Sequence, residues 1–231
     1  MRILAIETST EYCSVALLDG EALQVQSVLA GQTHSEILLG MIDRLLLDNG
    51  LALTDLDSLA FGAGPGSFTG VRIGASVAQG LAYGANIPVV PICTLEALAE
   101  EAQLPYIACA LDARLDEVYF AAYECDGQNW NTIVEPCLSA IGELAALPDH
   151  PWQGAGSGFG IREGQLANHL HIASKDATLV PQAAAIAKLA QRKLQAQANP
   201  AVHYDPALAQ PIYLRNKVAM TTAERHARGY K

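Results

Sequence analysis

A glycine-rich stretch, FGAGPGSFTGVRIG at residues 61–74, is the first place in the chain where chemistry could reside. Glycine-rich turns that open a helix often bind phosphate, because the first backbone N–H groups of a helix are free to donate. A Walker phosphate loop needs a lysine after its last glycine, however, and Arg72 is the only cation nearby. The dinucleotide pattern G-x-G-x-x-G is also absent. We therefore favour a tight strand-to-helix turn with Ser67 or Thr69 near the helix cap, with phosphate binding as the alternative.

The histidines and cysteines show no spacing typical of a metal or nucleophile site. Among the six histidines, His169 and His171 form the only close pair, which we interpret as a surface feature. The five cysteines are odd in number and lack a C-x-x-C spacing, which predicts reduced, mostly buried thiols. Cys13 or a serine would need a histidine base and an orienting acid to act as a peptidase nucleophile, and no local motif supplies them.

Composition places the chain among packed globular proteins. It has 231 residues, of which 51% are hydrophobic and 16% charged. The net charge of −10 and the pI near 4.9 make it a poor lone binder of nucleic acid, although a basic partner could supply that surface. No window approaches the roughly 18 unbroken apolar residues of a membrane span. The strand-like 3–6 segment follows Met1 and Arg2 without a leader pattern, so we expect a cytoplasmic protein that does not contact membranes.

The elements that must position these residues alternate between strand and helix patterns. The first half predicts strands at 3–7, 13–18 and 23–29, with Asp19-Gly20 as a hairpin turn. Thr33 and Glu36 suggest a capping box for a helix ending near Asp48. A strand at 58–63, a helix at 68–83, a strand at 88–92 and a helix at 94–102 follow. Pro105 marks a plausible lobe boundary.

The second half opens like the first. Residues 3–21 and 107–128 both read as an apolar strand ending in a carboxylate, a polar turn, a second strand and an Asp-Gly turn, with Glu7 corresponding to Asp112. A strand at 130–135, a helix near 139–147, another strand and a helix at 181–197 follow. We predict a duplicated α/β fold with lobes at 1–104 and 105–231, whose C-terminal segment returns to the first lobe. Chance similarity of two Asp-Gly hairpins is the alternative.

This duplication resembles the acetate and sugar kinase, heat-shock ATPase and actin superfamily. Within this superfamily, the chain resembles the TsaB (YeaZ) family over nearly its whole length. Four segments together carry this resemblance: ETSTEYCSVAL, GPGSFTGVRIG, ALDARLDEVYFAAY and PIYLRNKVA. Members of that family usually have Asp where this chain has Glu7. The added methylene puts a functional role for that carboxylate in doubt.

The resemblance implies a non-catalytic, scaffold-like subunit required for threonylcarbamoyladenosine formation in tRNA. A TsaD-type paralogue performs the transfer in such a system, a TsaC-type enzyme makes threonylcarbamoyl-adenylate, and a TsaE-type ATPase assists through the complex. The chain is expected to bind and organise the paralogue as a heterodimer, to form a homodimer when alone, and to contact tRNA only indirectly. No cofactor is expected to bind tightly, with ATP or ADP at the interface with partner subunits as the exception. The alternative is a free-standing ATP-dependent small-molecule kinase of the same superfamily.

Two groups of residues are candidates for the site. A vestigial nucleotide cleft is predicted from the superfamily resemblance and from the carboxylates and glycines that could face such a cleft: Glu7, Thr8, Asp112, Gly154 and Gly156. The same carboxylates could do acid–base work or merely cap turns, and the glycines are equally explained as a turn. The paralogue's His-x-x-x-His metal pair has no counterpart, and neither does a phosphate-binding lysine.

The strongest feature is a predicted interface on two helices. Apolar residues repeat at i, i+3 and i+4 along 35–50, in an arc wider than one sheet usually covers. The second helix has small residues at four-residue steps from Gly70, beside a stripe of Ile73, Val77 and Leu81. Which stripe faces the partner stays open. The predicted interface residues are His34, Ile37, Leu38, Met41, Ile42, Leu45, Arg72 and Ser76. Aspartate at Met41 or Leu45 is expected to weaken association and leave the fold intact.

Overall fold

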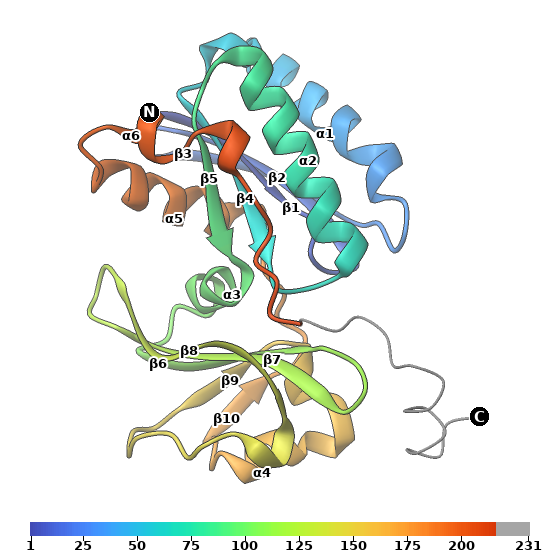
Figure 1. Cartoon of the computed structure of the whole chain (residues 1–231), viewed down its shortest axis with the longest axis vertical. Helices are drawn as coiled ribbons and strands as arrows, with labels where there is room; N and C mark the ends of the chain where they lie inside the picture. Colours follow the sequence, from blue (N-terminus) through green and yellow to red (C-terminus); the bar gives the residue numbers. More distant parts are fainter. Residues whose placement is uncertain (216–231) are drawn as a thin grey trace.

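The structure is a computed structural model that describes residues 1–215. The last part of the PIYLRNKVA segment, residues 216–219, lies outside the described residues, as does His226. Residues 1–215 form two lobes, each built on a five-stranded sheet, and the two sheets follow one another along the chain (Figure 1). No helix within residues 1–215 combines the length and the apolar character needed to cross a bilayer.

The first sheet consists of an antiparallel meander extended by two parallel strands. Its strands are β1 (Arg2–Glu7), β2 (Tyr12–Asp19), β3 (Ala22–Leu29), β4 (Ser58–Gly64) and β5 (Val89–Cys93). The order across the sheet is β3-β2-β1-β4-β5, with β4 parallel to β1 and β5 parallel to β4. The Asp19-Gly20 turn closes the first hairpin as predicted, because Gly20 adopts a positive φ of 63°. β1 is buried from Ile3 to Glu7 and β4 along its whole length, and both are mostly apolar, as expected of central strands covered on both faces.

The second sheet repeats this topology. Its strands are β6 (Tyr106–Asp112), β7 (Glu117–Cys125), β8 (Trp130–Ala140), β9 (Gln153–Ala155) and β10 (Ser174–Asp176). The order β8-β7-β6-β9-β10 places an antiparallel meander beside two parallel strands, as in the first sheet. Glu7 and Asp112 end β1 and β6, the equivalent strands. The predicted duplicated α/β fold is therefore confirmed.

Four longer helices cover these sheets. They are α1 (His34–Asp48), α2 (Phe68–Ala85), α3 (Thr94–Ala102) and α5 (Ala183–Gln195). In Figure 1, α1 and α2 lie on one side of the first sheet and α5 lies on the other. α3 lies between the two sheets, where Leu95 and Leu98 pack with Ile107 of β6. Although α5 follows the second sheet in sequence, its buried alanines pack on the first sheet.

The shorter elements are η1 (Leu53–Asp55), η2 (Ile141–Glu143), η3 (Ser157–Phe159), η4 (Ile161–Gly164), α4 (Gln165–His169), α6 (Pro200–His203) and η5 (Pro206–Leu208). The predicted helix near 139–147 is wrong. β8 continues to Ala140, which pairs with Glu117 of β7, and only the short η2 turn follows. The predicted capping box at Thr33 is also wrong, since its hydroxyl donates to the Ala30 carbonyl at 2.9 Å and does not cap α1.

Candidate functional site

The glycine block is a packing device between β1 and α2. Of the two predicted cap candidates, Ser67 and not Thr69 caps α2, by accepting a hydrogen bond from the Gly70 amide at 3.3 Å. The Ser67 amide donates to the Ser9 carbonyl at 2.7 Å, and the Thr8 hydroxyl donates to the Gly70 carbonyl at 2.8 Å. A Cβ on Gly70 would lie 2.0 Å from the Thr8 carbonyl oxygen. The glycine therefore allows the turn after β1 to contact the first turn of α2 directly, which favours the structural interpretation of this motif.

Glu7 is enclosed in the first lobe. Its Oε1 accepts a hydrogen bond from the Ser9 amide, whereas Oε2 has no hydrogen-bond partner among the described residues. A Cβ on Gly62 of β4 would collide with Oε2, so the carboxyl lies directly against that glycine. Burial raises the pKa of Glu7 from its ordinary 4.5 to about 7, and the bond from the Ser9 amide only partly opposes this. The side chain is held in the lobe interior, away from solvent.

A cleft of about 990 Å³ lies between the lobes. It is lined by the turn after β1, the start of α2, the β6–β7 turn and residues 212–215. Asp112 lines this inter-lobe cleft, but its carboxylate is already occupied. Oδ1 accepts from the Arg114 amide at 2.7 Å, and Oδ2 pairs with the Arg114 guanidinium at 3.1 Å. Asp112 therefore caps its own turn.

The two candidate glycines of the second lobe make room for that lobe's own atoms. A Cβ on Gly154 would lie 2.8 Å from the Phe159 ring, and one on Gly156 would lie 2.4 Å from the Ala110 carbonyl oxygen. Gly156 also has a φ of +100°. Of the five residues predicted to line one nucleotide cleft, the structure places only Asp112 in the inter-lobe cleft. That prediction was wrong for Glu7, Thr8, Gly154 and Gly156, which pack inside their lobes.

Cys13 and His34 are both buried in the first lobe. Cys13 is buried, and burial together with the nearby Glu7 carboxyl raises the pKa of its thiol to about 11, so little thiolate forms at neutral pH. His34 is buried, and its Nε2 lies 3.1 Å from the Tyr12 carbonyl oxygen. No group of three or more His, Cys, Asp or Glu side chains suited to a metal ion occurs within residues 1–215.

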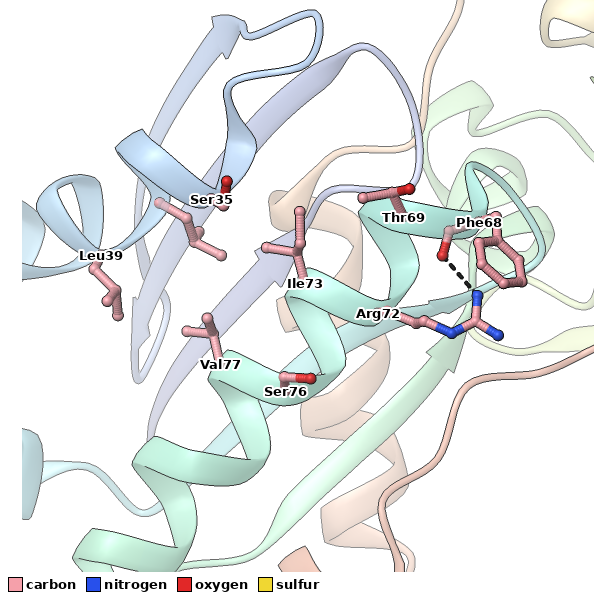
Figure 2. A pocket seen from close by; sticks show the side chains of 9 residues that line it. Ser35, Leu39, Phe68, Thr69, Arg72, Ile73, Ser76 and Val77 are labelled. Atoms are coloured by element: carbon pink, nitrogen blue, oxygen red, sulfur yellow. Dashed lines mark hydrogen bonds between the residues drawn. The ribbon is translucent and has the colours of Figure 1, made fainter.

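A second concavity of about 380 Å³ lies between α1 and α2, and we call it the α1–α2 groove (Figure 2). Its lining residues are Ser35, Leu38 and Leu39 from α1, and Phe68, Thr69, Arg72, Ile73, Ser76 and Val77 from α2. Leu39 and Phe68 are each 54% exposed. Most of this lining is apolar, and exposed apolar surface of this kind is typical of sites that bind proteins. It is the best candidate interface within the described residues.

The structure corrects the predicted interface residues on α1. His34, Leu38, Ile42 and Leu45 are all buried, and the three apolar ones pack in the core of the first lobe, although Leu38 also lines the α1–α2 groove. Most of the regular apolar stripe is therefore the face that α1 turns toward its own sheet. Because Leu45 is 2% exposed, the structure leads us to expect that Leu45→Asp destabilises the fold, contrary to the expectation from the sequence.

The remaining interface candidates lie nearer the surface. Ile37 and Met41 are half-buried, while Arg72 and Ser76 line the α1–α2 groove. Sequence reasoning missed Leu39 and Phe68. Leu39 lies off the buried stripe, and that position is the signal that could have identified it.

Phe68 and Arg72 line both the groove and the inter-lobe cleft. The Arg72 guanidinium carbon lies 3.3 Å from the centroid of the Phe68 ring and 4.8 Å from that of Tyr213. Its Nη1 donates to the Phe68 carbonyl at 2.8 Å, the bond drawn in Figure 2. Arg72, which contacts both aromatic rings, therefore lies where the two concavities meet.

Two sheets of the same strand order in one chain, with a cleft between them, define a duplicated two-lobe α/β protein of the acetate and sugar kinase, heat-shock ATPase and actin superfamily. Comparison with known proteins narrows this class. The family model described as "TsaD: tRNA N6-adenosine threonylcarbamoyltransferase" matches residues 25–223. The chain is 35% identical to the tRNA threonylcarbamoyladenosine biosynthesis protein TsaB of Escherichia coli (strain K12), over 95% of this chain and 96% of that protein.

Two further relatives support the same family assignment. The Haemophilus influenzae protein of the same description is 52% identical over 126 residues, which is 52% of this chain and about half (53%) of that relative's length. The structure "YeaZ from Pseudomonas aeruginosa" superposes with a TM-score of 0.82 at 33% identity, covering 92% of this chain and 99% of that one. The chain belongs to the TsaB (YeaZ) family.

Proposed function

We propose that this chain is a non-catalytic, scaffold-like subunit required for threonylcarbamoyladenosine formation in tRNA, and that it binds and organises a TsaD-type catalytic paralogue. The observation that carries this proposal is the α1–α2 groove, which exposes Leu39 and Phe68 beside the half-buried Ile73 and Val77. The relatives' names, which specify threonylcarbamoyladenosine biosynthesis, support the reaction. The match to a TsaD-type family model supports a paralogue of the same fold as the partner.

The state of the ionisable groups supports a subunit without chemistry of its own. Asp112 is paired within its own turn by Arg114, and Glu7 is buried against Gly62. The Cys13 thiol is held protonated by burial, which gives no support to a peptidase nucleophile. In the proposal, the paralogue and the TsaE-type ATPase supply the catalytic groups, and any ATP or ADP binds where the subunits meet.

The same groove would serve a homodimer when the chain is alone. Exposed apolar side chains are stabilised by burial against any complementary surface, and a second copy presents the same surface. The chain's acidity leaves tRNA contact to its partners, so tRNA is bound indirectly. Because tRNA modification takes place where tRNA resides, the proposal places the subunit in the cytoplasm.

The test is to mix the purified chain with its TsaD-type paralogue and follow the complex by sedimentation velocity, with transfer activity measured in parallel. We expect a heterodimer, and we expect transfer that requires the paralogue and is absent with this chain alone. A magnesium-dependent ATPase of the chain alone that is lost in Asp112→Ala would contradict the proposal and support the kinase alternative. Absence of any complex with the paralogue would also contradict it.

A further inference from the structure

Residues 211–215 connect the two lobes without belonging to either sheet. The Ile212 amide donates to the Ala63 carbonyl of β4 at 2.7 Å, and its carbonyl oxygen would lie 3.2 Å from a Cβ on Gly64. Three residues later, Arg215 reaches the second lobe. Its Nη2 donates to the Ala113 carbonyl at 2.9 Å and lies 2.7 Å from a Glu117 carboxylate oxygen. We call residues 211–215 the inter-lobe strap.

Between these two anchors the strap contacts the groove residues. The centroid of the Tyr213 ring lies 4.8 Å from the Arg72 guanidinium carbon, which also lies 3.3 Å from the centroid of the Phe68 ring. Phe68 and Arg72 form one end of the α1–α2 groove, while Tyr213 and Arg215 line only the inter-lobe cleft. A continuous set of contacts therefore runs from the second lobe through Arg215, Tyr213 and Arg72 to the groove.

We propose that Tyr213 and Arg215 are positioning residues that couple the attachment of the second lobe to the shape of the α1–α2 groove. Holding Arg215 in the β6–β7 turn fixes the strap, the strap places Tyr213 on Arg72, and Arg72 and Phe68 then present the groove in its binding-competent form. Coupling between two sites is reciprocal, so occupation of the groove stabilises the strap in the same measure. The partner-binding arm of this proposal rests on the proposed function, whereas the coupling itself is a property of the isolated chain.

Two arginines of the same cleft provide a matched pair of variants. Arg215 links the lobes and its side chain is 18% exposed. Arg114 also lines the cleft, but its ion pair with Asp112 stays within one turn of the second lobe and its side chain is 86% exposed. Both variants remove one positive charge, so a difference between Arg215→Gln and Arg114→Gln reports the strap and not the charge of the cleft.

The first measurement is amide hydrogen exchange of the free chain. We expect Arg215→Gln to raise the exchange rate in the first two turns of α2, residues 68–75, by about fivefold or more, and Arg114→Gln to leave it unchanged. Tyr213→Leu should reproduce the effect of Arg215→Gln, while Tyr213→Phe, which retains the ring over Arg72, should behave as wild type. Tyr213 is 55% exposed, so its variants fold even if Arg215→Gln does not, with circular dichroism as the folding control.

The second measurement is the affinity for the TsaD-type paralogue. Arg215→Gln and Tyr213→Leu should weaken it about fivefold or more, and the paralogue should slow exchange at 212–215 in wild type. If the paralogue does not bind wild type at all, the proposed function fails and the exchange of the free chain still decides the coupling. Unchanged exchange at 68–75 in both Arg215→Gln and Tyr213→Leu overturns the inference, as does an equal effect of Arg114→Gln.

Discussion

Leu39→Asp offers the sharpest test of the α1–α2 groove as a protein interface. Leu39 is 54% exposed, so an occupant of the groove would bury about half of its surface, whereas its contribution to the chain's own core is small. Fully burying a leucine side chain stabilises by roughly 1.5–3 kcal/mol, and half of that is about 1 kcal/mol. An aspartate in the same place would be dehydrated without a partner, which costs at least about 2 kcal/mol more.

Together these contributions amount to about 3 kcal/mol, which corresponds to a roughly 100-fold weaker complex. The fold should survive, because an exposed leucine-to-aspartate change in a helix costs only about 0.7 kcal/mol in helix propensity. Sedimentation velocity over a concentration series would measure both homodimer and paralogue affinity. Circular dichroism would verify that the variant is folded.

Val25→Asp is the matched control. The substitution introduces the same charge at a residue that is 44% exposed. Val25, however, lies on the other face of the first sheet. It pairs directly with Ala16, and directly paired residues share a face. Ala16 packs in the cluster that contains α5, so Val25 faces away from the groove. If Leu39→Asp folds and binds as tightly as wild type, or if Val25→Asp weakens binding equally, the groove is not the interface.

Three further outcomes follow from burial and packing. Leu45→Asp should lower the free energy of unfolding by about 4 kcal/mol or more in urea titrations, because it places a charge in the core; a folded variant of wild-type stability would contradict the burial of this stripe. Burial raises the pKa of Glu7 from 4.5 to about 7, above its value in the unfolded chain, so this group's stability contribution is complete below pH 4.5 and is lost as pH rises to 7. That loss should be at most roughly 3 kcal/mol and should be absent in Glu7→Gln. If the free energy of unfolding of Glu7→Gln changes with pH in parallel with that of wild type, this role of Glu7 is refuted. Gly70→Ala should destabilise the fold by about 2 kcal/mol or more, because its Cβ would meet the Thr8 carbonyl. Gly80→Ala on the same helix, where the space is open, should stabilise the fold by up to about 1 kcal/mol. Equal thermal midpoints of the two variants would contradict this packing.

The meanders could be predicted from the sequence because their signals are local. Apolar runs of strand length, separated by polar turns and Asp-Gly pairs, specify where each hairpin reverses, and the recurrence of this pattern around Glu7 and Asp112 reveals the duplication. The α2 cap was predicted as far as two candidates, Ser67 and Thr69, which stand between a glycine-rich turn and an apolar-periodic segment, and the structure selects Ser67.

The segment after residue 135 was predicted to be a helix because its strand conformation depends on pairing with residues distant in the sequence. Residues such as Leu138 and Ala140 are compatible with a helix, but β7 is long enough to pair with them, and the added ladder of hydrogen bonds extends β8. The burial of the Glu7 carboxyl also could not be predicted from the neighbouring sequence. Its burial follows from Gly62 on β4, a strand more than fifty residues away in the sequence.

The interface residues show why a hydrophobic stripe alone does not locate a binding face. Leu38 and Leu39 are the same residue type at adjacent positions, yet Leu38 is 1% exposed and Leu39 is 54% exposed. Periodicity identifies the face of the helix on which most apolar side chains lie, and this face packs against the chain's own sheet. A partner must then use what the sheet leaves uncovered, which is the apolar residue off the stripe. Leu39 on α1 and Phe68 at the start of α2 both meet that condition, and they border the same groove.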